Sequence, residues 1–369
     1  MNKFKYLYID DEVDCNTFIS GFCDTEYIDL ELLDMEINMS IDNVVEKIKS
    51  KWNDYSGIIF DMRLNGGGPN RLSCSASTIA QNLRSMCVED HFPSKPFVLC
   101  STDAELRKAI SNDTTSRDLY DYVFSKDMDC DTEIIAKNLY CLAEAYKVLT
   151  EKPFEPNVIL GRDTGDLDDS VVEYLERYIA NSNAIVQFII NDLFRYPGLL
   201  INEDVLAARL GIDRKQSGEA FNELSNLLFD RFGYKGVLSN YRRFFWNIDL
   251  IKWFEEISNN LCLQLTEAGR RVEIVQRATN IKGIVAANPI EHDTSTYFWT
   301  ICEAKKEPID PLEAYTIMED CPLKPWQEPR YISFLALSEH TYDEIYMLSA
   351  SEKKRYDARV DAINDTNNG

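Results

Sequence analysis

The sequence GIIFDMRLN, residues 57–65, indicates the fold of the first part of the chain more clearly than its neighbours do. Its uncharged run from Gly57 to Phe60 ends abruptly in Asp61, as a fully buried strand does where it reaches the edge of a sheet. We expect other short apolar runs to be strands that also end in polar side chains. Residues 5–9 stop at Asp10 and Asp11, residues 96–100 stop at Ser101, and residues 122–125 stop at Lys126.

Helical patterns alternate with these strands. Residues 28–35 form one more β-rich run, and Ser40 is expected to cap a helix, because apolar residues recur at helical spacing up to Trp52. Further helices are expected over residues 75–87, near 103–111 and over 131–149. Strands that alternate with helices form a parallel sheet covered on both faces. Residues 1–150 are therefore predicted to be an α/β domain, a doubly wound five-stranded parallel sheet.

The polar residues at the strand ends are expected to meet, because such sheets bind ligands outside the carboxyl ends of their strands. Asp10, Asp11 and Asp61 would then form a cluster of carboxylates that repel one another and need a cation. Mg²⁺ prefers hard oxygen ligands of this kind. Ser101 and Lys126 suit a phosphoryl group, since a hydroxyl donates to one oxygen and an ammonium neutralises another. Together these groups describe an aspartate that becomes phosphorylated.

The same residues resemble the receiver domain of two-component response regulators. The strings YLYIDDE, IIFDMRLNGG, PFVLCST and YVFSKD carry the resemblance, and they occur in the expected order. The resemblance implies a flavodoxin-like receiver fold with Asp61 as phosphoacceptor. It implies Ser101 as the switch hydroxyl and Lys126 as the lysine that binds the phosphate. The magnesium ligands that it implies are Asp10, Asp11, Asp61 and the backbone carbonyl of Arg63. An unphosphorylated receiver that serves only as a docking module is the alternative.

The middle of the chain is predicted to be mostly helical. Residues 151–169 combine prolines, glycines and acids, which predicts a linker. Apolar residues then recur at helical spacing up to Phe194, which predicts a long helix that packs in a core or in a homodimer. Two short helices over 203–210 and 217–229, followed by an aromatic stretch up to Ile248, weakly resemble a winged helix-turn-helix. We therefore treat residues 170–258 as a long helix plus a winged-helix-like module.

DNA is not the favoured partner of this module. The candidate recognition helix, residues 217–228, carries two glutamates and two asparagines but no lysine or arginine. The whole chain has a formal net charge of −23, which opposes contact with a phosphate backbone. We therefore expect an output that works by contact with another protein.

The remaining residues, 259–369, are expected to form an α+β region to which the sequence assigns no role. A helix over 265–278 is predicted to expose Arg270, Arg271 and Arg277. The beginning of the chain is charged and no apolar run is long enough for a membrane span, so we expect a soluble, cytoplasmic protein without membrane contact.

The sequence thus predicts a response regulator of a phosphorelay. A partner histidine kinase would phosphorylate Asp61, because the chain has three histidines and no ATP-binding motif. The chain would catalyse only its own phosphorylation and dephosphorylation, and is otherwise not expected to be an enzyme. Two alternatives stay open: a DNA-binding transcription factor controlled by phosphorylation, and a phosphate sink or regulatory subunit of a multi-gene signalling or defence system.

Overall fold

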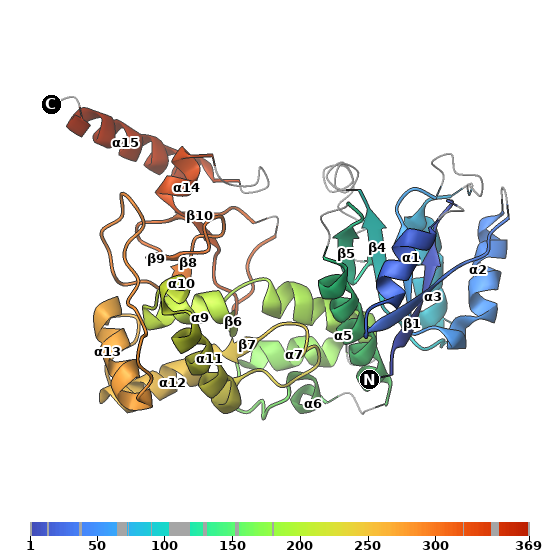
Figure 1. Ribbon diagram of the computed structural model, residues 1–369, viewed down its shortest axis with the longest axis horizontal. Coiled ribbons are helices and arrows are strands. Elements are labelled where there is room, and N and C mark those ends of the chain that lie inside the picture. The colour runs from blue at the N-terminus through green and yellow to red at the C-terminus, as the bar shows by residue number, and fades with distance from the viewer. Residues whose placement is uncertain are drawn as a thin grey trace. The chain divides into compact units, whose positions relative to one another are not determined.

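The computed structural model describes residues 2–12, 15–36, 39–64, 72, 74–89, 91–102, 119–127, 131–151, 155–178, 181–319, 321–340 and 347–367. The chain divides into two compact units (Figure 1). The N-terminal unit holds Met1–Asp166, Val172–Phe188 and Gly236–Tyr241. The C-terminal unit holds Leu167–Val171, Ile189–Lys235 and Arg242–Gly369.

A five-stranded sheet organises the N-terminal unit. Its strand order is β2-β1-β3-β4-β5, and all neighbouring strands are parallel. This strand order is that of flavodoxin-like sheets. Their ligands bind at the carboxyl ends of the strands between β1 and β3, where the order of the strands changes direction. The predicted doubly wound α/β fold is therefore confirmed. The strands are β1 (Phe4–Ile9), β2 (Ile28–Leu32), β3 (Gly57–Asp61), β4 (Phe97–Ser101) and β5 (Tyr122–Ser125).

Helices cover both faces of this sheet, as Figure 1 shows. α2 packs against α3, and α1 packs against α5. The hydroxyl of Ser40 accepts a hydrogen bond from the N–H of Asn43, which confirms the predicted N-cap of α2. The helix expected near residues 103–111 lies outside the described residues. The bounds are α1 (Asn16–Cys23), α2 (Ile41–Ser50), a 3₁₀ turn η1 (Trp52–Asp54), α3 (Ala76–Glu89) and α5 (Thr132–Glu151).

The segment expected to be one long helix is divided. It contains α7 (Asp169–Arg177) and α8 (Ser182–Gln187). The helix α6 (Pro156–Leu160) lies before it, within the residues 151–169 that the sequence predicts to be a linker. The side chain of Asn181 accepts from the N–H of Ala184 and so starts α8 as a new helix. A π-helical turn, η3 (Phe188–Phe194), continues from α8. The polar capping residue Asn181 thus ends the regular spacing of apolar residues that predicts one continuous helix.

A buried carboxylate attaches α8 to the amino end of β5. Asp121 accepts from Arg84 Nη2 on α3 at 2.8 Å, from the Tyr146 hydroxyl on α5 at 2.9 Å, and from Asn183 Nδ2 on α8 at 3.0 Å. Gln187 Nε2 donates to the Tyr120 carbonyl at 2.9 Å. Because Asp121 is buried, these bonds replace the water that its charge would otherwise need.

The short segment Gly236–Tyr241 also belongs to the N-terminal unit. The N–H of Val237 donates to the Ile159 carbonyl at 2.8 Å, and Asn240 Nδ2 donates to a carboxylate oxygen of Glu144 at 3.1 Å. The Tyr241 ring meets the ring of Tyr122 on β5 edge to face, with the centroids 6.5 Å apart. Part of the aromatic stretch in the middle of the chain therefore packs beside β5 and α5.

In the C-terminal unit, several helices pack together with a two-stranded sheet around one hydrophobic core. β6 (Leu200–Asn202) pairs antiparallel with β7 (Phe244–Trp246). The aromatic stretch thus supplies the partner strand of β6, and the N–H of Tyr234 donates to the Phe244 carbonyl at 2.8 Å. The helices between and after these strands are α9 (Glu203–Leu210), α10 (Arg214–Ser217), α11 (Glu219–Phe232), α12 (Asn247–Ser258) and α13 (Ala268–Thr279).

Short strands and two helices complete the C-terminal unit. They build a second cluster of buried side chains that includes Cys302, Tyr315 and Phe334. α15 packs against this cluster through half-buried residues such as Tyr356 and Val360. The elements are β8 (Thr300–Ile301), β9 (Pro308–Ile309), β10 (Tyr315–Thr316), β11 (Tyr331–Ile332), α14 (Phe334–Ser338) and α15 (Ala350–Asn367).

The prediction that Arg271 is exposed is wrong. Its side chain is fully buried on α13, whereas the neighbouring Arg270 side chain faces solvent. The Arg271 guanidinium donates to four carbonyl groups in particular. They belong to Thr266 at 2.5 Å, Phe298 at 2.6 Å, Arg209 at 2.9 Å and Gln264 at 3.3 Å. Carbonyl oxygens from helix α9 and from loops thus accept hydrogen bonds from an arginine that the periodicity of its own helix places at the surface.

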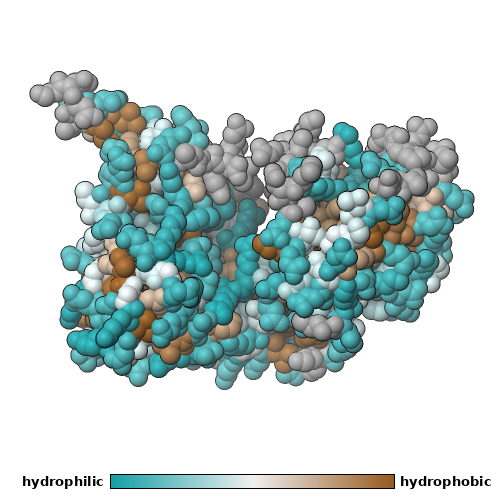
Figure 2. Space-filling model, in the orientation of Figure 1, coloured by the Kyte–Doolittle hydropathy of each residue, from teal (hydrophilic) through white to brown (hydrophobic). Residues whose placement is uncertain are grey.

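The face of the protein visible in Figure 2 is mostly hydrophilic, with apolar side chains gathered in small separate patches. Such scattered apolar exposure is ordinary for a folded protein surface. Of the helices that the structure describes, none combines the length and the apolar character that crossing a bilayer requires.

Candidate functional site

Three carboxylates meet at the carboxyl edge of the five-stranded sheet. Asp10 and Asp11 follow β1, and Asp61 is the last residue of β3. One oxygen from each lies within 4.8 Å of the others, and the three residues are only 4%, 4% and 7% exposed. Because β1 and β3 are adjacent parallel strands, their ends deliver these side chains to one place.

Local backbone turns orient two of these carboxylates. The N–H of Glu12 donates to Asp10 Oδ1 at 3.0 Å, and the N–H of Arg63 donates to Asp61 Oδ2 at 2.7 Å. In both cases the donor lies two residues after the aspartate, as in an Asx turn. The bond holds one oxygen of each side chain against the backbone and turns the other toward the centre of the cluster.

Lys126 brings a positive charge to the cluster from the end of β5. Its Nζ lies 2.6 Å from Asp61 Oδ1 and 2.8 Å from Asp10 Oδ2. The N–H of Lys126 donates to the Ser101 carbonyl at 2.8 Å, which fixes the start of the side chain beside β4. The lysine therefore bridges the two strands that carry Asp10 and Asp61.

Ser101 and Arg63 lie at the same edge. Ser101 is the last residue of β4, is almost fully buried, and pairs in register with Ser125. Arg63 is exposed and follows β3. The structure thus brings together the strand ends that carry every predicted site residue, while the roles assigned to Ser101 and to the Arg63 carbonyl stay predictions.

Burial and charge have opposite effects on the pKa values of Lys126 and of the two aspartates that it joins. For Asp10, burial favours the neutral form, but the ammonium of Lys126 outweighs it and lowers the pKa below its usual value. For Asp61, burial prevails over Lys126 and raises the pKa. Burial opposes the charge of Lys126, yet acidic groups around it, Cys100, Asp61 and Asp10 among them, raise its pKa. The lysine therefore stays protonated at neutral pH.

The donor set fits a hard divalent cation. Three carboxyl groups are buried close to one another, and the ammonium of Lys126 contacts two of them. Oxygen donors of this kind suit Mg²⁺, which takes few protein ligands and keeps several waters. Asp10, Asp11 and Asp61 are the residues that can hold such an ion, and Lys126 is placed to meet a group bound to it.

Sequence reasoning missed two aromatic residues of the site. The hydroxyl of Tyr8 donates to Asp10 Oδ2, and Lys126 Nζ lies 5.1 Å from the centre of the Tyr8 ring. The Phe18 ring on α1 lies 5.6 Å from the same Nζ. The signal for Tyr8 was available, because residues two apart on a strand share a face. No local pattern pointed to Phe18, which the packing of α1 supplies.

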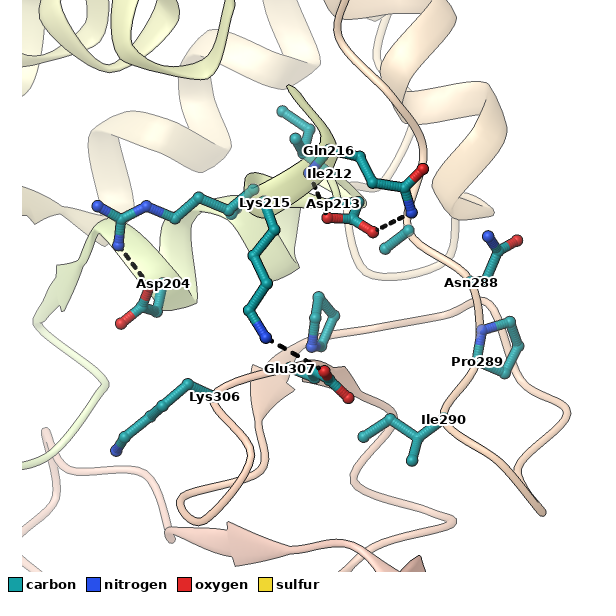
Figure 3. Close-up of a pocket in the computed structure, with 14 residues that line it drawn as sticks. Asp204, Ile212, Asp213, Lys215, Gln216, Asn288, Pro289, Ile290, Lys306 and Glu307 are labelled. Carbon is teal, nitrogen blue, oxygen red and sulfur yellow. Dashed lines mark hydrogen bonds and ion pairs between the residues drawn. The ribbon is translucent and has the colours of Figure 1, made fainter. Parts of the chain in front are cut away.

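A pocket in the C-terminal unit is lined by side chains of both charges. Figure 3 shows Lys215 directed toward Glu307 and Gln216 directed toward Asp213. Lys215 Nζ lies 3.4 Å from Glu307 Oε1, and Gln216 Nε2 donates to Asp213 Oδ2 at 2.6 Å. Arg214 pairs with Asp204 in the same pocket, and Lys306 pairs with Glu303. The basic groups of this pocket thus each have a carboxylate partner, whereas three carboxylates crowd together at the edge of the large sheet.

The chain is similar to solved structures of receiver domains. A response regulator receiver domain protein from Clostridium thermocellum is 15% identical, with 40% of this chain and 98% of that chain covered and a TM-score of 0.29. A two-component response regulator from Clostridium difficile is 20% identical, with 41% and 100% covered and a TM-score of 0.25. The receiver domain of a Saccharomyces cerevisiae response regulator, solved with a histidine phosphotransfer signaling protein, is 14% identical, with 38% and 89% covered and a TM-score of 0.26. No family model and no curated protein matches the chain.

Proposed function

We propose that this protein is a response regulator whose N-terminal unit is phosphorylated on Asp61. The observation that supports the proposal is the convergence of Asp10, Asp11, Asp61 and Lys126 at one sheet edge. A purely structural acidic turn does not need three buried carboxylates around one lysine. A carboxylate nucleophile, a site for a divalent ion and a fixed ammonium are the parts that phosphoryl transfer requires.

In the proposed reaction, an oxygen of Asp61 attacks the phosphorus of a phosphohistidine on a partner histidine kinase. A P–O bond forms while the P–N bond breaks, and the leaving imidazole takes up a proton. Mg²⁺ held by Asp10, Asp11 and Asp61 would supply charge neutralisation for the phosphoryl oxygens. Lys126 already lies 2.6 Å from Asp61 Oδ1, so it can neutralise a phosphoryl oxygen without a large movement. Ser101, from the adjacent strand, is the proposed hydroxyl partner of the acyl phosphate.

We infer that the output is contact with another protein. Glu219, Glu223 and Asp230 are exposed along α11, the helix that a winged-helix reading would place against DNA. The same face carries Asn222 and Asn226. Carboxylates there would repel the phosphate backbone. An acidic and amide-rich helix face suits a basic protein surface instead.

Two segments of the N-terminal unit are suited to carry the signal away from the site. α8 is bonded to Asp121 at the start of β5, and the Tyr241 ring lies against Tyr122 on the same strand. Both segments come from the part of the sequence that follows α5. If β5 shifts when Lys126 changes partner, α8 and the segment 236–241 would shift with it, because elements that pack together move as rigid bodies.

The test is phosphorylation of the full chain by a small phosphoramidate donor with Mg²⁺, followed by intact-mass measurement. The wild type should gain one phosphoryl group that hydroxylamine removes, as it removes acyl phosphates. Asp61→Asn should gain none. Asp54→Asn is the matched control, because Asp54 is exposed and precedes β3 while Asp61 ends it. An unmodified wild type, or a phosphate that persists in Asp61→Asn, would refute the assignment.

Partner assays separate the output alternatives. We expect the phosphorylated chain to capture a protein partner that the Asp61→Asn chain does not capture. A DNA mobility shift that appears at low salt only after phosphorylation would favour the transcription-factor alternative. Phosphate uptake without any change in partner binding would favour the phosphate-sink alternative.

A further inference from the structure

Tyr8 contacts both a carboxylate of the site, Asp10, and its ammonium group, Lys126. It lies on β1 two residues before Asp10, and its side chain is buried. Its hydroxyl donates to Asp10 Oδ2, the same oxygen that Lys126 Nζ approaches at 2.8 Å. The other oxygen, Asp10 Oδ1, accepts from the Glu12 N–H at 3.0 Å. Three donors from three different positions therefore fix the rotation of one carboxylate.

The ring of Tyr8 also supports the lysine. Lys126 Nζ lies 5.1 Å from the ring centre, within the range of a cation–π contact. Phe18 lies 5.1 Å from the Tyr8 ring, centre to centre, and flanks the same ammonium. The tyrosine thus contacts Asp10 through its hydroxyl and Lys126 through the face of its ring.

We propose that Tyr8 is a positioning residue that holds Asp10 in the orientation needed to bind the divalent ion. The inference rests on the proposed function for the identity of the ion, and it adds a requirement outside the carboxylate cluster. Donors behind a metal ligand orient it, and their loss typically weakens metal binding by about 10 to 100-fold. Without the hydroxyl, Lys126 is the remaining donor to Oδ2 among the described residues, and the lysine must leave part of this contact when a cation arrives.

The test is Mg²⁺ binding to the full chain, measured by isothermal titration calorimetry with magnesium chloride. Tyr8→Phe keeps the ring and removes the hydroxyl, and its Mg²⁺ dissociation constant should rise about tenfold. Tyr6→Phe is the matched control. Tyr6 is on the same strand, is equally buried, and donates its hydroxyl to the Leu139 carbonyl at 2.6 Å, away from the carboxylates. Its dissociation constant should equal that of the wild type.

The outcomes separate this inference from the proposed function. A wild type that binds no Mg²⁺ overturns both. A wild type that binds Mg²⁺ while Tyr8→Phe binds it equally well overturns the positioning role and leaves the phosphorylation site intact. Equal weakening in Tyr6→Phe would overturn it too, because a general effect on β1 would then be the cause.

A measurement on the wild type keeps the inference testable if Tyr8→Phe does not fold. In protein labelled with ¹³C-tyrosine, the hydrogen-bonded Tyr8 hydroxyl proton should give a slowly exchanging NMR signal with a contact to its own ring. The signal should shift as Mg²⁺ is added, because Asp10 then shares its charge with the ion. A hydroxyl signal that stays unchanged up to Mg²⁺ saturation would overturn the positioning role.

Discussion

The ammonium of Lys126 lies 2.6 Å from Asp61 Oδ1, although the two residues belong to strands separated in the sheet by β4. The lysine also reaches Asp10 Oδ2 and so connects the ends of β1, β3 and β5. In the absence of a metal ion, this single cation balances part of the charge of three carboxylates. The stability of the N-terminal unit is therefore linked to the chemistry of the site.

Lys126→Met should destabilise the N-terminal unit in metal-free solution at neutral pH. The buried carboxylates of Asp10 and Asp61 lose their partner, and breaking such a pair costs about 3 kcal/mol. The free energy of unfolding can be measured from urea-dependent hydrogen exchange of the sheet. Because Asp61 has a raised pKa and protonates first as the pH falls, the loss should shrink toward acid. A loss that is the same at pH 4 and pH 7 would contradict the electrostatic cause.

Lys95 should make the stability of the N-terminal unit depend on alkaline pH. Its Nζ is buried and donates to the carbonyls of Trp52 and Tyr55, and burial lowers its pKa to about 8. The unfolded chain binds the proton more tightly between pH 8 and the ordinary value of 10.5. The contribution of Lys95 to stability should therefore increase as the pH rises through this window, by up to about 3 kcal/mol.

The comparison that isolates this effect is Lys95→Met against the wild type. The difference in unfolding free energy between them should change steeply from pH 8 to pH 10. Lys51→Met is the control, because the Lys51 side chain is 39% exposed and pairs with Glu31 at 3.7 Å. Parallel stability curves for the wild type and Lys95→Met would show that the lysine is not perturbed.

Asp121→Asn should be among the most damaging single changes in the N-terminal unit. It leaves the Arg84 guanidinium buried without its counter-charge and weakens the bonds to Tyr146 and Asn183. The expected loss is about 3–5 kcal/mol in the free energy of unfolding. Asp29→Asn, which breaks an exposed ion pair with Lys3, should change it by less than about 1 kcal/mol. Similar losses for the two variants would contradict the central position of Asp121.

Arg271→Ala and Arg270→Ala should differ although the residues are neighbours on α13. Removing Arg271 leaves several buried carbonyls without a donor, at about 1–3 kcal/mol for each group that water does not reach. Arg270 pairs with Glu273 at the surface, where its loss should cost less than about 1 kcal/mol. Thermal unfolding of the C-terminal unit measures both. If Arg271→Ala unfolds at the same midpoint temperature as the wild type, water must replace the guanidinium as the donor to these carbonyls.

The candidate site was predictable because its geometry follows from a repeated local rule. Parallel strands end at the same edge, so polar residues placed after Ile9, Phe60 and Ser125 had to approach one another once the sheet was recognised. The helix stripe that ends at Phe194 was less predictable. The side chain of Asn181 accepts from the N–H of Ala184 and caps a new helix. The free energies of a capped break and of an uninterrupted helix are too similar for the apolar periodicity to distinguish them.

The sequence predicts the five strands of the sheet, the helices α2, α3 and α5, and the polar residues at the strand ends, but not α1 or the division between α7 and α8. Periodicity and chain order carry that information, because burial repeats along each element. Contacts between distant segments, which the sequence does not show, decide that Asp121 anchors α8 and that Arg271 is buried. Burial of Arg271 and the anchoring of α8 depend on donors and acceptors that distant segments bring into the interior, where each polar group must find a partner.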